Sequence, residues 1–128
     1  MKAFVAGIST YMENEDMEFR YRIYKENELL VEKKGFKKYE KPLVVSHFAL
    51  LGLLKELKKM PQEDIEIVIH DAALYEQIRG TSTTKNKEVL KVVELVKKEL
   101  DKFPVKVLIT DVTGDFEAKT KWDQEVSF

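Results

Sequence analysis

One aspartate, Asp71, stands at a junction between predicted elements where a carboxylate could take part in chemistry. The apolar, alternating segment 65–69 predicts a strand, and the residues from Asp71 to Gly80 predict a short helix that the glycine ends. A carboxylate at this point can cap the helix by accepting backbone N–H groups, or it can serve as a catalytic acid. The sequence leaves both roles open.

A polar loop after Gly80 supplies groups that could bind phosphate or sugar. The residues concerned are Thr84, Lys85, Asn86 and Lys87. Their hydroxyl, amide and ammonium donors suit such ligands, although loops of this composition are also common on protein surfaces. Thr84 or Asn86 could also cap the next helix, which is predicted from the apolar positions between 89 and 100.

A second basic group surrounds Gly35 and Phe36, near the end of the third predicted strand. It consists of Lys33, Lys34, Lys37 and Lys38, followed by Tyr39. These side chains could contact a nucleic-acid backbone. Lysines on an edge strand also discourage aggregation between sheet edges, and this second interpretation is favoured.

Composition limits both the size and the chemistry. The 128 residues, of which 44% are hydrophobic and 35% charged, predict one domain, residues 1–128, with a sizeable core. The absence of cysteine excludes a catalytic thiol and agrees with a cytoplasmic location. The chain lacks an apolar run of roughly eighteen residues, so no membrane association is expected. A net charge of −1 gives no general attraction to nucleic acid.

Hydrophobic periodicity predicts the elements that must position these residues. It places strands over 2–10, 18–24 and 28–36, with a turn at 25–27, and a core helix over 46–60. Further strands over 65–69 and 105–110 alternate with the two helices described above, and a turn over 111–115 leads to a short terminal segment expected to be helical. This order predicts an α/β fold. Its mixed five-stranded sheet would have three antiparallel strands followed by parallel crossovers, with helices on its faces.

The order of elements, together with the segment 71–86, resembles the ribonuclease H type 1 family, especially its short bacterial and plant branch related to reverse-transcriptase ribonuclease H domains. The matching residues are Asp71, Gly80 and the pair Lys85-Asn86, which stand as in the family pattern D-S-x-x-x-x-x-x-x-G followed by K-N. The resemblance covers nearly the whole chain and implies a ribonuclease H-like fold. It also implies hydrolysis of the RNA strand of an RNA/DNA hybrid, assisted by two magnesium ions roughly 4 Å apart.

The resemblance implies four acidic metal ligands, and this sequence matches two of them at most. Asp71 keeps the position at the end of the fourth strand, and Asp123 matches the terminal position if a gap is allowed. Ala6 stands where the metal-bridging aspartate is expected, while Ser46, beside His47, stands near the expected glutamate. An alanine cannot bind a metal ion, so weak Mg²⁺ binding and inefficient cleavage are expected.

The sequence thus favours a ribonuclease H-like protein that binds RNA/DNA hybrid or structured RNA and cleaves it little or not at all. The residues assigned to binding are Thr84, Lys85, Asn86 and Lys87, and the remnant metal site is assigned to Asp71 and Asp123. One alternative is a non-catalytic protein-interaction or dimerisation module, for which a homodimer is a possible assembly. Another is an active Mg²⁺-dependent hybrid endonuclease in which Glu13, Asp111 or Asp115 compensates for the missing carboxylates.

Overall fold

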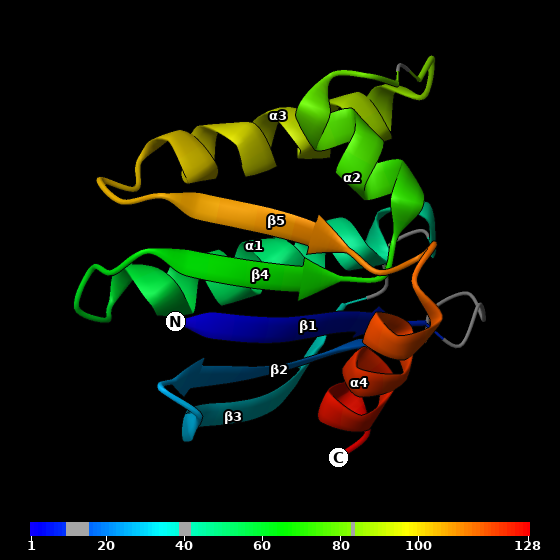
Figure 1. Cartoon of the computed structure of the whole chain (residues 1–128). Helices are drawn as coiled ribbons and strands as arrows, with labels where there is room; N and C mark the ends of the chain where they lie inside the picture. The colour runs from blue at the N-terminus through cyan, green and yellow to red at the C-terminus, as the bar shows by residue number, and fades with distance from the viewer. Residues whose placement is uncertain (10–15, 39–41, 83) are drawn as a thin grey trace.

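The computed structural model of the chain describes residues 1–9, 16–38, 42–82 and 84–128 (Figure 1). The elements in chain order are β1 (Lys2–Ile8), β2 (Met17–Lys25), β3 (Glu28–Lys37), the 3-10 helix η1 (Pro42–Val44), α1 (Val45–Lys58), β4 (Ile65–Ile69), α2 (Ala72–Arg79), α3 (Lys87–Asp101), β5 (Val107–Asp111) and α4 (Phe116–Val126).

Within the described residues, five strands form one mixed sheet in the order β3-β2-β1-β4-β5. β2 pairs antiparallel with both β1 and β3, whereas β4 pairs parallel with both β1 and β5. The β2–β3 hairpin turns at Glu26 and Asn27, which have φ angles of 51° and 67°. Two consecutive residues with positive φ make a tight turn whose twist matches that of the strands. The predicted α/β class and its mixed five-stranded sheet are confirmed.

The helices cover the two faces of the sheet unequally (Figure 1). Strand residues alternate between the faces, and Val5, Ile23 and Ile67 join the main core with buried leucines of α1 and with Val96 of α3. On the opposite face α4 crosses β1 and β2, where Phe4, Ala6, Val68, Val112 and Val126 form a second, smaller cluster with Trp122 at its edge. The carboxyl end of β1 is therefore enclosed between α1 and α4.

Several predicted bounds are wrong by a few residues. β1 ends at Ile8, and the predicted end at position 10 lies outside the described residues. α1 ends at Lys58 instead of position 60. β5 begins at Val107 instead of position 105, because the Lys106 N–H donates to Oδ1 of Asp64 (3.0 Å) and not to a neighbouring strand. β5 also includes Asp111, which the sequence places in a turn.

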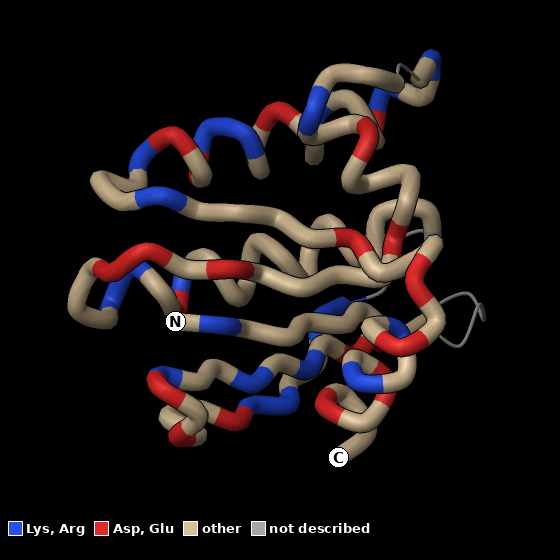
Figure 2. The backbone as a smooth tube through the Cα atoms, in the orientation of Figure 1, with Lys and Arg blue, Asp and Glu red and all other residues tan. Residues whose placement is uncertain are grey.

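Basic and acidic residues alternate along much of the backbone (Figure 2). This distribution agrees with the small net charge of −1 for the whole chain. In the part of the chain that the structure describes, no helix is both long and apolar enough to span a membrane.

Candidate functional site

Two adjacent parallel strands, β1 and β4, end at the same edge of the sheet, and α1 begins close to this edge. Gly7 makes this close approach possible, because a Cβ atom at Gly7 would lie 2.6 Å from both the carbonyl oxygen and Cγ1 of Val45. Any larger residue would push the start of α1 away from β1. The first turn of α1, which carries Ser46, is thereby held beside the end of β1.

A small cavity of about 40 Å³ lies at this edge of the sheet. Its lining consists of Val5, Ala6, Gly7, Ser46, Ala49, Ile69, His70 and Trp122. The structure therefore brings together Ala6 and Ser46, the two positions at which the resemblance leads one to expect carboxylates. The lining is apolar and aromatic apart from Ser46 and His70, and its volume is close to that of one water molecule.

Trp122 of α4 borders this cavity and fixes the helix to the sheet. Its Nε1–H donates a hydrogen bond to the carbonyl oxygen of Val5, 3.0 Å away. Its ring meets the ring of His70 edge to face, with centroids 5.1 Å apart. Strand alternation turns His70 away from the core residue Ile69 and toward α4. An indole ring thus occupies the side of α4 that faces the strand ends.

Asp71 follows β4 directly and caps α2. Its Oδ1 accepts a hydrogen bond from the backbone N–H of Leu74 at 2.9 Å, so the predicted N-cap is confirmed. Gly80, with φ of 75°, ends the same helix as predicted. The backbone N–H of Asp71 donates to Oδ1 of Asp111 at 3.0 Å, and that oxygen also accepts from the Thr113 hydroxyl at 2.9 Å. Two aspartates therefore meet where β4 and β5 end.

Asp123 lies on α4 and is exposed. Its neighbour Trp122 faces the sheet, and successive residues of an α-helix point about 100° apart, so the two side chains leave the helix in different directions. Among residues 1–9, 16–38, 42–82 and 84–128, no group of three or more Asp, Glu, His or Cys side chains could hold a metal ion. The structure pairs Asp71 with Asp111 without gathering a larger cluster in this part of the chain.

Three other acidic residues, Glu13, Asp111 and Asp115, are the candidates that could replace the missing carboxylates. Asp115 caps α4 by accepting a hydrogen bond from the backbone N–H of Ala118 at 3.0 Å. Asp111 supports the start of α2 through Asp71, as described above. Glu13 lies outside the described residues.

The loop before α3 combines structural and exposed residues. Oδ1 of Asn86 accepts from the backbone N–H groups of Glu88 and Val89 at 2.9 and 3.2 Å, so Asn86 is the cap of α3. Thr84 accepts from the N–H of Asn86 at 3.1 Å. Lys85 and Lys87 are both exposed. Their ammonium groups are the part of this loop that remains available to an anionic ligand.

His47 lies in the interior between α1 and α2 and is only 1% exposed. Its Nε2–H donates to Oε1 of Gln77 at 2.7 Å. Its Nδ1 is buried and has no hydrogen-bond partner among the described residues. The position beside Ser46 in the sequence therefore does not place this imidazole at the surface of the site.

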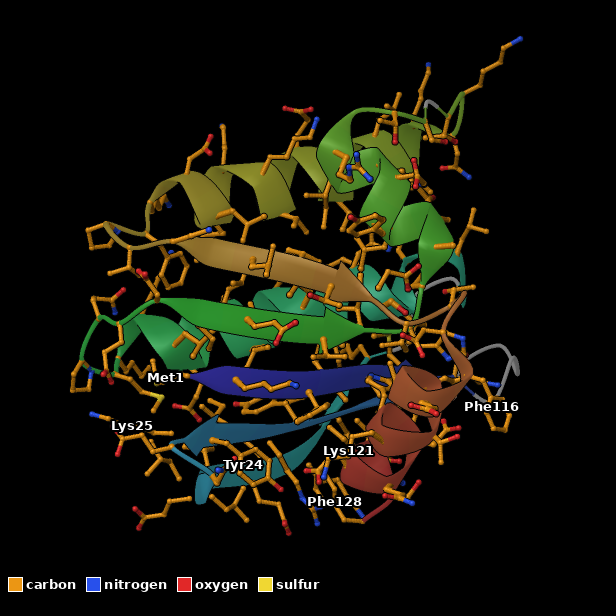
Figure 3. The ribbon with its side chains drawn as sticks, viewed as in Figure 1. Met1, Tyr24, Lys25, Phe116, Lys121 and Phe128 are labelled. Atoms are coloured by element: carbon orange, nitrogen blue, oxygen red, sulfur yellow. The ribbon has the colours of Figure 1, made fainter. Side chains whose placement is uncertain are left out.

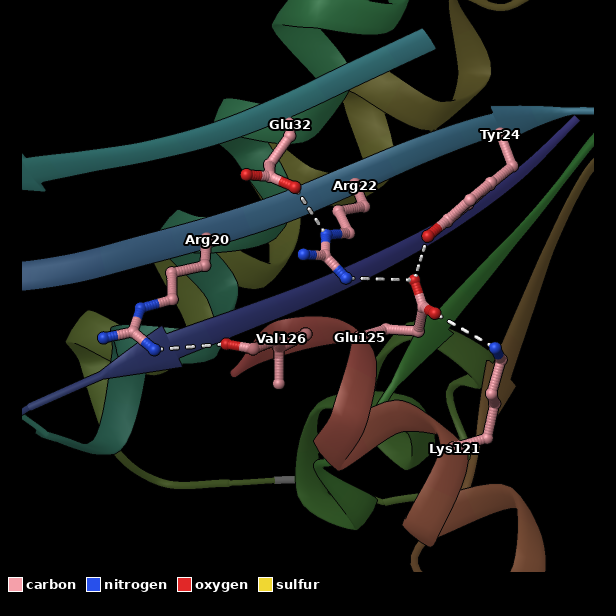
Figure 4. Close-up of polar contacts among 7 residues, drawn as sticks. All are labelled: Arg20, Arg22, Tyr24, Glu32, Lys121, Glu125 and Val126. Atoms are coloured by element: carbon pink, nitrogen blue, oxygen red, sulfur yellow. Dashed lines mark hydrogen bonds and ion pairs between the residues drawn. The ribbon is translucent and has the colours of Figure 1, made fainter. Parts of the chain in front are cut away.

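Sequence reasoning missed a polar network that joins α4 to β2 around Glu125 (Figure 4). The Glu125 carboxylate is buried and accepts a hydrogen bond from the Tyr24 hydroxyl. Lys121 donates to it at 3.0 Å, and a guanidinium nitrogen of Arg22 lies 3.7 Å away. Lys121 and Glu125 are four residues apart on one helix, a spacing that predicts an ion pair between them. Their partners on β2 are about a hundred residues away in the sequence, so no local pattern could reveal them.

The neighbouring contacts extend this network to the end of the chain. Arg20 donates to the carbonyl oxygen of Val126 at 3.2 Å (Figure 4), and the guanidinium of Arg22 lies 4.6 Å from the ring centroid of Phe128. Tyr24, Lys121 and Phe128 all lie on the face of the sheet that carries α4, while Phe116, 84% exposed, projects from the first turn of that helix (Figure 3). The last turn of α4 is thus tied to β2 by charged groups.

The environment of Glu125 shifts the pKa of both central groups. Burial alone would raise the pKa of Glu125, but the hydrogen bonds from Tyr24 and Lys121 and the charges of Lys121 and Arg22 hold it below its usual value. Burial and the contact with Glu125 raise the pKa of Tyr24, although Arg22 opposes this effect. Glu125 is therefore an ionised, fully engaged group whose role is to attach α4.

Comparison with solved structures identifies the fold. The RNase H1 of the halophilic archaeon Halobacterium salinarum superposes with a TM-score of 0.80 at 15% identity, over 98% of this chain and 92% of that chain. The N-terminal RNase H domain of a Mycobacterium tuberculosis protein gives 0.76 at 14% identity, over 98% and 93%. LC11-RNase H1 in complex with an RNA/DNA hybrid gives 0.70 at 13% identity, over 98% and 95%. No protein-family model and no curated protein matches the sequence.

The chain therefore has a ribonuclease H-like fold, as the sequence resemblance predicted. At identities of 11–15% the likeness shows the fold and leaves the activity to be argued from the side chains.

Proposed function

We propose that this protein is a ribonuclease H-like nucleic-acid-binding module that binds RNA/DNA hybrid or structured RNA and cleaves it little or not at all. The observation that carries the proposal is the combination of an RNase H-like fold, whose solved relatives include one bound to an RNA/DNA hybrid, with the exposed lysines Lys85 and Lys87. Lysine ammonium groups on a loop suit phosphate contacts that position a nucleic acid without reading its sequence.

The donor set at the strand ends supports a role without efficient hydrolysis. Two-metal hydrolysis requires several carboxylate oxygens around a pair of magnesium ions. Ala6 offers no donor, Ser46 offers a hydroxyl, and one oxygen of Asp71 already accepts the Leu74 N–H. These residues do not fit a two-magnesium centre. Asp71 and Asp123 remain our proposed ligands for a weakly bound single Mg²⁺.

A binding titration tests the nucleic-acid role. Labelled RNA/DNA hybrid, RNA duplex and DNA duplex would be titrated with the protein at several salt concentrations. The double variant Lys85→Ala/Lys87→Ala is expected to weaken hybrid binding about tenfold and to lower the slope of log affinity against log salt by about 2. Lys98→Ala/Lys106→Ala, which removes two other exposed lysines, is the matched control and is expected to keep the slope.

The same samples distinguish the alternatives. Absence of binding, or an affinity that does not change with salt, would overturn the nucleic-acid proposal. Mg²⁺-dependent cleavage that is abolished by Asp71→Asn would overturn the proposal that the metal site is incomplete. It would favour an active endonuclease instead.

A protein-interaction module on the same fold is the second candidate function. A different observation favours it, namely the large groove between β3 and the helices α1 and α3. This groove is separate from the small cavity at the ends of β1 and β4.

A further inference from the structure

A groove of about 520 Å³ lies between the β2–β3 hairpin and the helices α1 and α3. Its lining consists of Met17, Phe19, Tyr21, Lys33, Phe36, Lys37, Phe48, Leu51, Gly52, Lys55, Glu56, Lys59, Leu95 and Glu99. The volume lies within the range of pockets that hold small ligands, and it is large enough for one or two large side chains of a bound peptide.

Two glycines on facing elements lie next to the ring of Phe19, which is part of the groove lining. A Cβ atom at Gly35 of β3 would lie 2.3 Å from the Phe19 ring, so the ring can lie across β3 only because Gly35 has no side chain. At Gly52 of α1 a Cβ atom would meet the same ring at 4.0 Å, an ordinary van der Waals distance. Gly52 itself adds no side chain to the groove. Phe36, 68% exposed, extends this apolar surface.

The rim of the groove is positively charged. Lys33, Lys37, Lys55 and Lys59 are all exposed, and none of them forms an ion pair with another described residue. The two acidic side chains of the lining are already engaged. Glu56 accepts a hydrogen bond from the Tyr21 hydroxyl at 3.1 Å, and Glu99 contacts Lys58 and, at 3.0 Å, Lys102.

This combination of an apolar floor and lysines that form no ion pair among the described residues indicates which ligand the groove suits. A ligand that buries a large apolar side chain over the floor would gain affinity from that burial. Carboxylates on either side of this side chain would meet the lysines without displacing an ion pair between described residues. A bound phosphate backbone would use the same lysines, and its charges would lie as close to Glu56 and Glu99 as the carboxylates of a peptide would, so charge alone does not choose between these ligands.

The aromatic side chains favour a peptide over a single nucleic-acid strand, which stacks its bases on open ring faces. The Phe48 ring is already covered, because the ammonium of Lys37 lies 4.4 Å from its centroid. Phe19 is stacked on Tyr21 with centroids 6.1 Å apart. Among the described phenylalanines that line the groove, Phe36 is therefore the one whose ring face remains open for stacking.

We propose that the groove between β3, α1 and α3 binds an acidic peptide segment of another protein, which inserts a large apolar side chain over Phe19 and places its carboxylates against Lys33, Lys37, Lys55 and Lys59.

The test uses the full chain and a fluorescently labelled synthetic peptide in which Glu and Asp flank a central Trp and Leu. Gly52→Leu places a side chain in the groove from a helical position where a Cβ atom makes only an ordinary contact, and is expected to reduce peptide affinity at least about tenfold. Gly52→Ala is the matched control and is expected to retain binding, because its Cβ makes only an ordinary contact. Lys55→Glu/Lys59→Glu is expected to reduce the affinity by a similar factor, whereas Lys91→Glu/Lys98→Glu on the exposed side of α3 is not.

Circular dichroism would verify that each variant is folded. Loss of peptide binding in Gly52→Leu and Lys55→Glu/Lys59→Glu, with hybrid binding unchanged, would support this groove as a site independent of the nucleic-acid surface. The proposal is overturned if the peptide does not bind the wild-type chain, or if both groove variants bind it as tightly as the wild type does. It is also overturned if a single-stranded oligonucleotide, and not the peptide, loses its affinity in Gly52→Leu.

Discussion

The backbone N–H of Asp71 donates to Oδ1 of Asp111 at 3.0 Å, which joins the ends of the parallel strands β4 and β5 through one aspartate side chain. Asp71 in turn uses its own Oδ1 to accept the N–H of Leu74 at the start of α2. Each carboxylate therefore satisfies a backbone donor that the end of an element would otherwise leave unpaired. This arrangement explains the presence of both aspartates without a metal ion.

Replacement of Asp71 distinguishes a capping role from a chemical one. Asp71→Ala removes the acceptor for the Leu74 N–H and is expected to lower the free energy of unfolding by about 1 kcal/mol. Asp71→Asn and Asp71→Ser keep an oxygen acceptor and are expected to stay within about 0.5 kcal/mol of the wild type. Urea denaturation measures these differences. Equal destabilisation by all three replacements would show that the negative charge, and not the cap, is what matters.

Gly7 is expected to be far less tolerant of substitution than Gly114. In Gly7→Ala the new methyl group would lie 2.6 Å from the carbonyl oxygen of Val45, so α1 must shift, at a cost of about 1–3 kcal/mol. Gly114→Ala is the matched control, because no atom lies within 4 Å of a Cβ atom there. Thermal and urea unfolding of both variants test the difference. A stable Gly7→Ala protein would contradict the close approach of α1 to β1.

The sequence predicted the parts of the molecule that depend on local chemistry. The caps at Asp71 and Asn86 and the glycine that ends α2 follow from side-chain acceptors and positive φ, which act within a few residues. The direction of a side chain on α4 depends instead on how that helix rotates against the sheet. A sequence pattern therefore did not reveal that Trp122 would bind the carbonyl oxygen of Val5 and pack against His70.

Contacts between distant segments were equally hidden from local patterns. Tyr24 and Glu125 are separated by 101 residues, and neither shows a local signal of the other. Two glycines on different elements, Gly35 and Gly52, both adjoin the ring of Phe19 in the groove. Only the packing of α1 against the β2–β3 hairpin brings these two positions together.

Restoring carboxylates at the small cavity should create dependence on a metal ion. Ala6→Asp places a carboxylate at a buried position, where Ala6 is 7% exposed and belongs to an apolar cluster, and is expected to cost about 2–4 kcal/mol at neutral pH. The double variant Ala6→Asp/Ser46→Glu is expected to regain part of this loss when Mg²⁺ is added, since a cation would neutralise the paired carboxylates.

Thermal unfolding with and without Mg²⁺ measures this effect independently of any cleavage. The single variant Ser46→Glu serves as the control for an added charge at the rim of the cavity. Equal stability of the double variant with Mg²⁺ and with a chelator would show that positions 6 and 46 cannot share a metal ion.

Glu125 should make the stability of the fold depend on pH in the acidic range. Because its pKa is lower in the folded state than in the unfolded chain, the unfolded state binds more protons as the pH falls through this range. The stabilisation by Glu125 is therefore present at neutral pH and is lost as the pH falls through the folded-state pKa. Glu125→Gln is expected to be less stable at pH 7, by about 1–2 kcal/mol, because the amide keeps one acceptor oxygen but removes the negative charge that faces Lys121 and Arg22.

The difference between wild type and Glu125→Gln should shrink as the pH is lowered, and urea denaturation at several pH values measures it. Asp123→Asn is the matched control, because Asp123 lies on the same helix and is exposed. A constant difference between wild type and Glu125→Gln at all pH values would mean that Glu125 acts through packing alone, without the ionised contacts to Lys121 and Arg22.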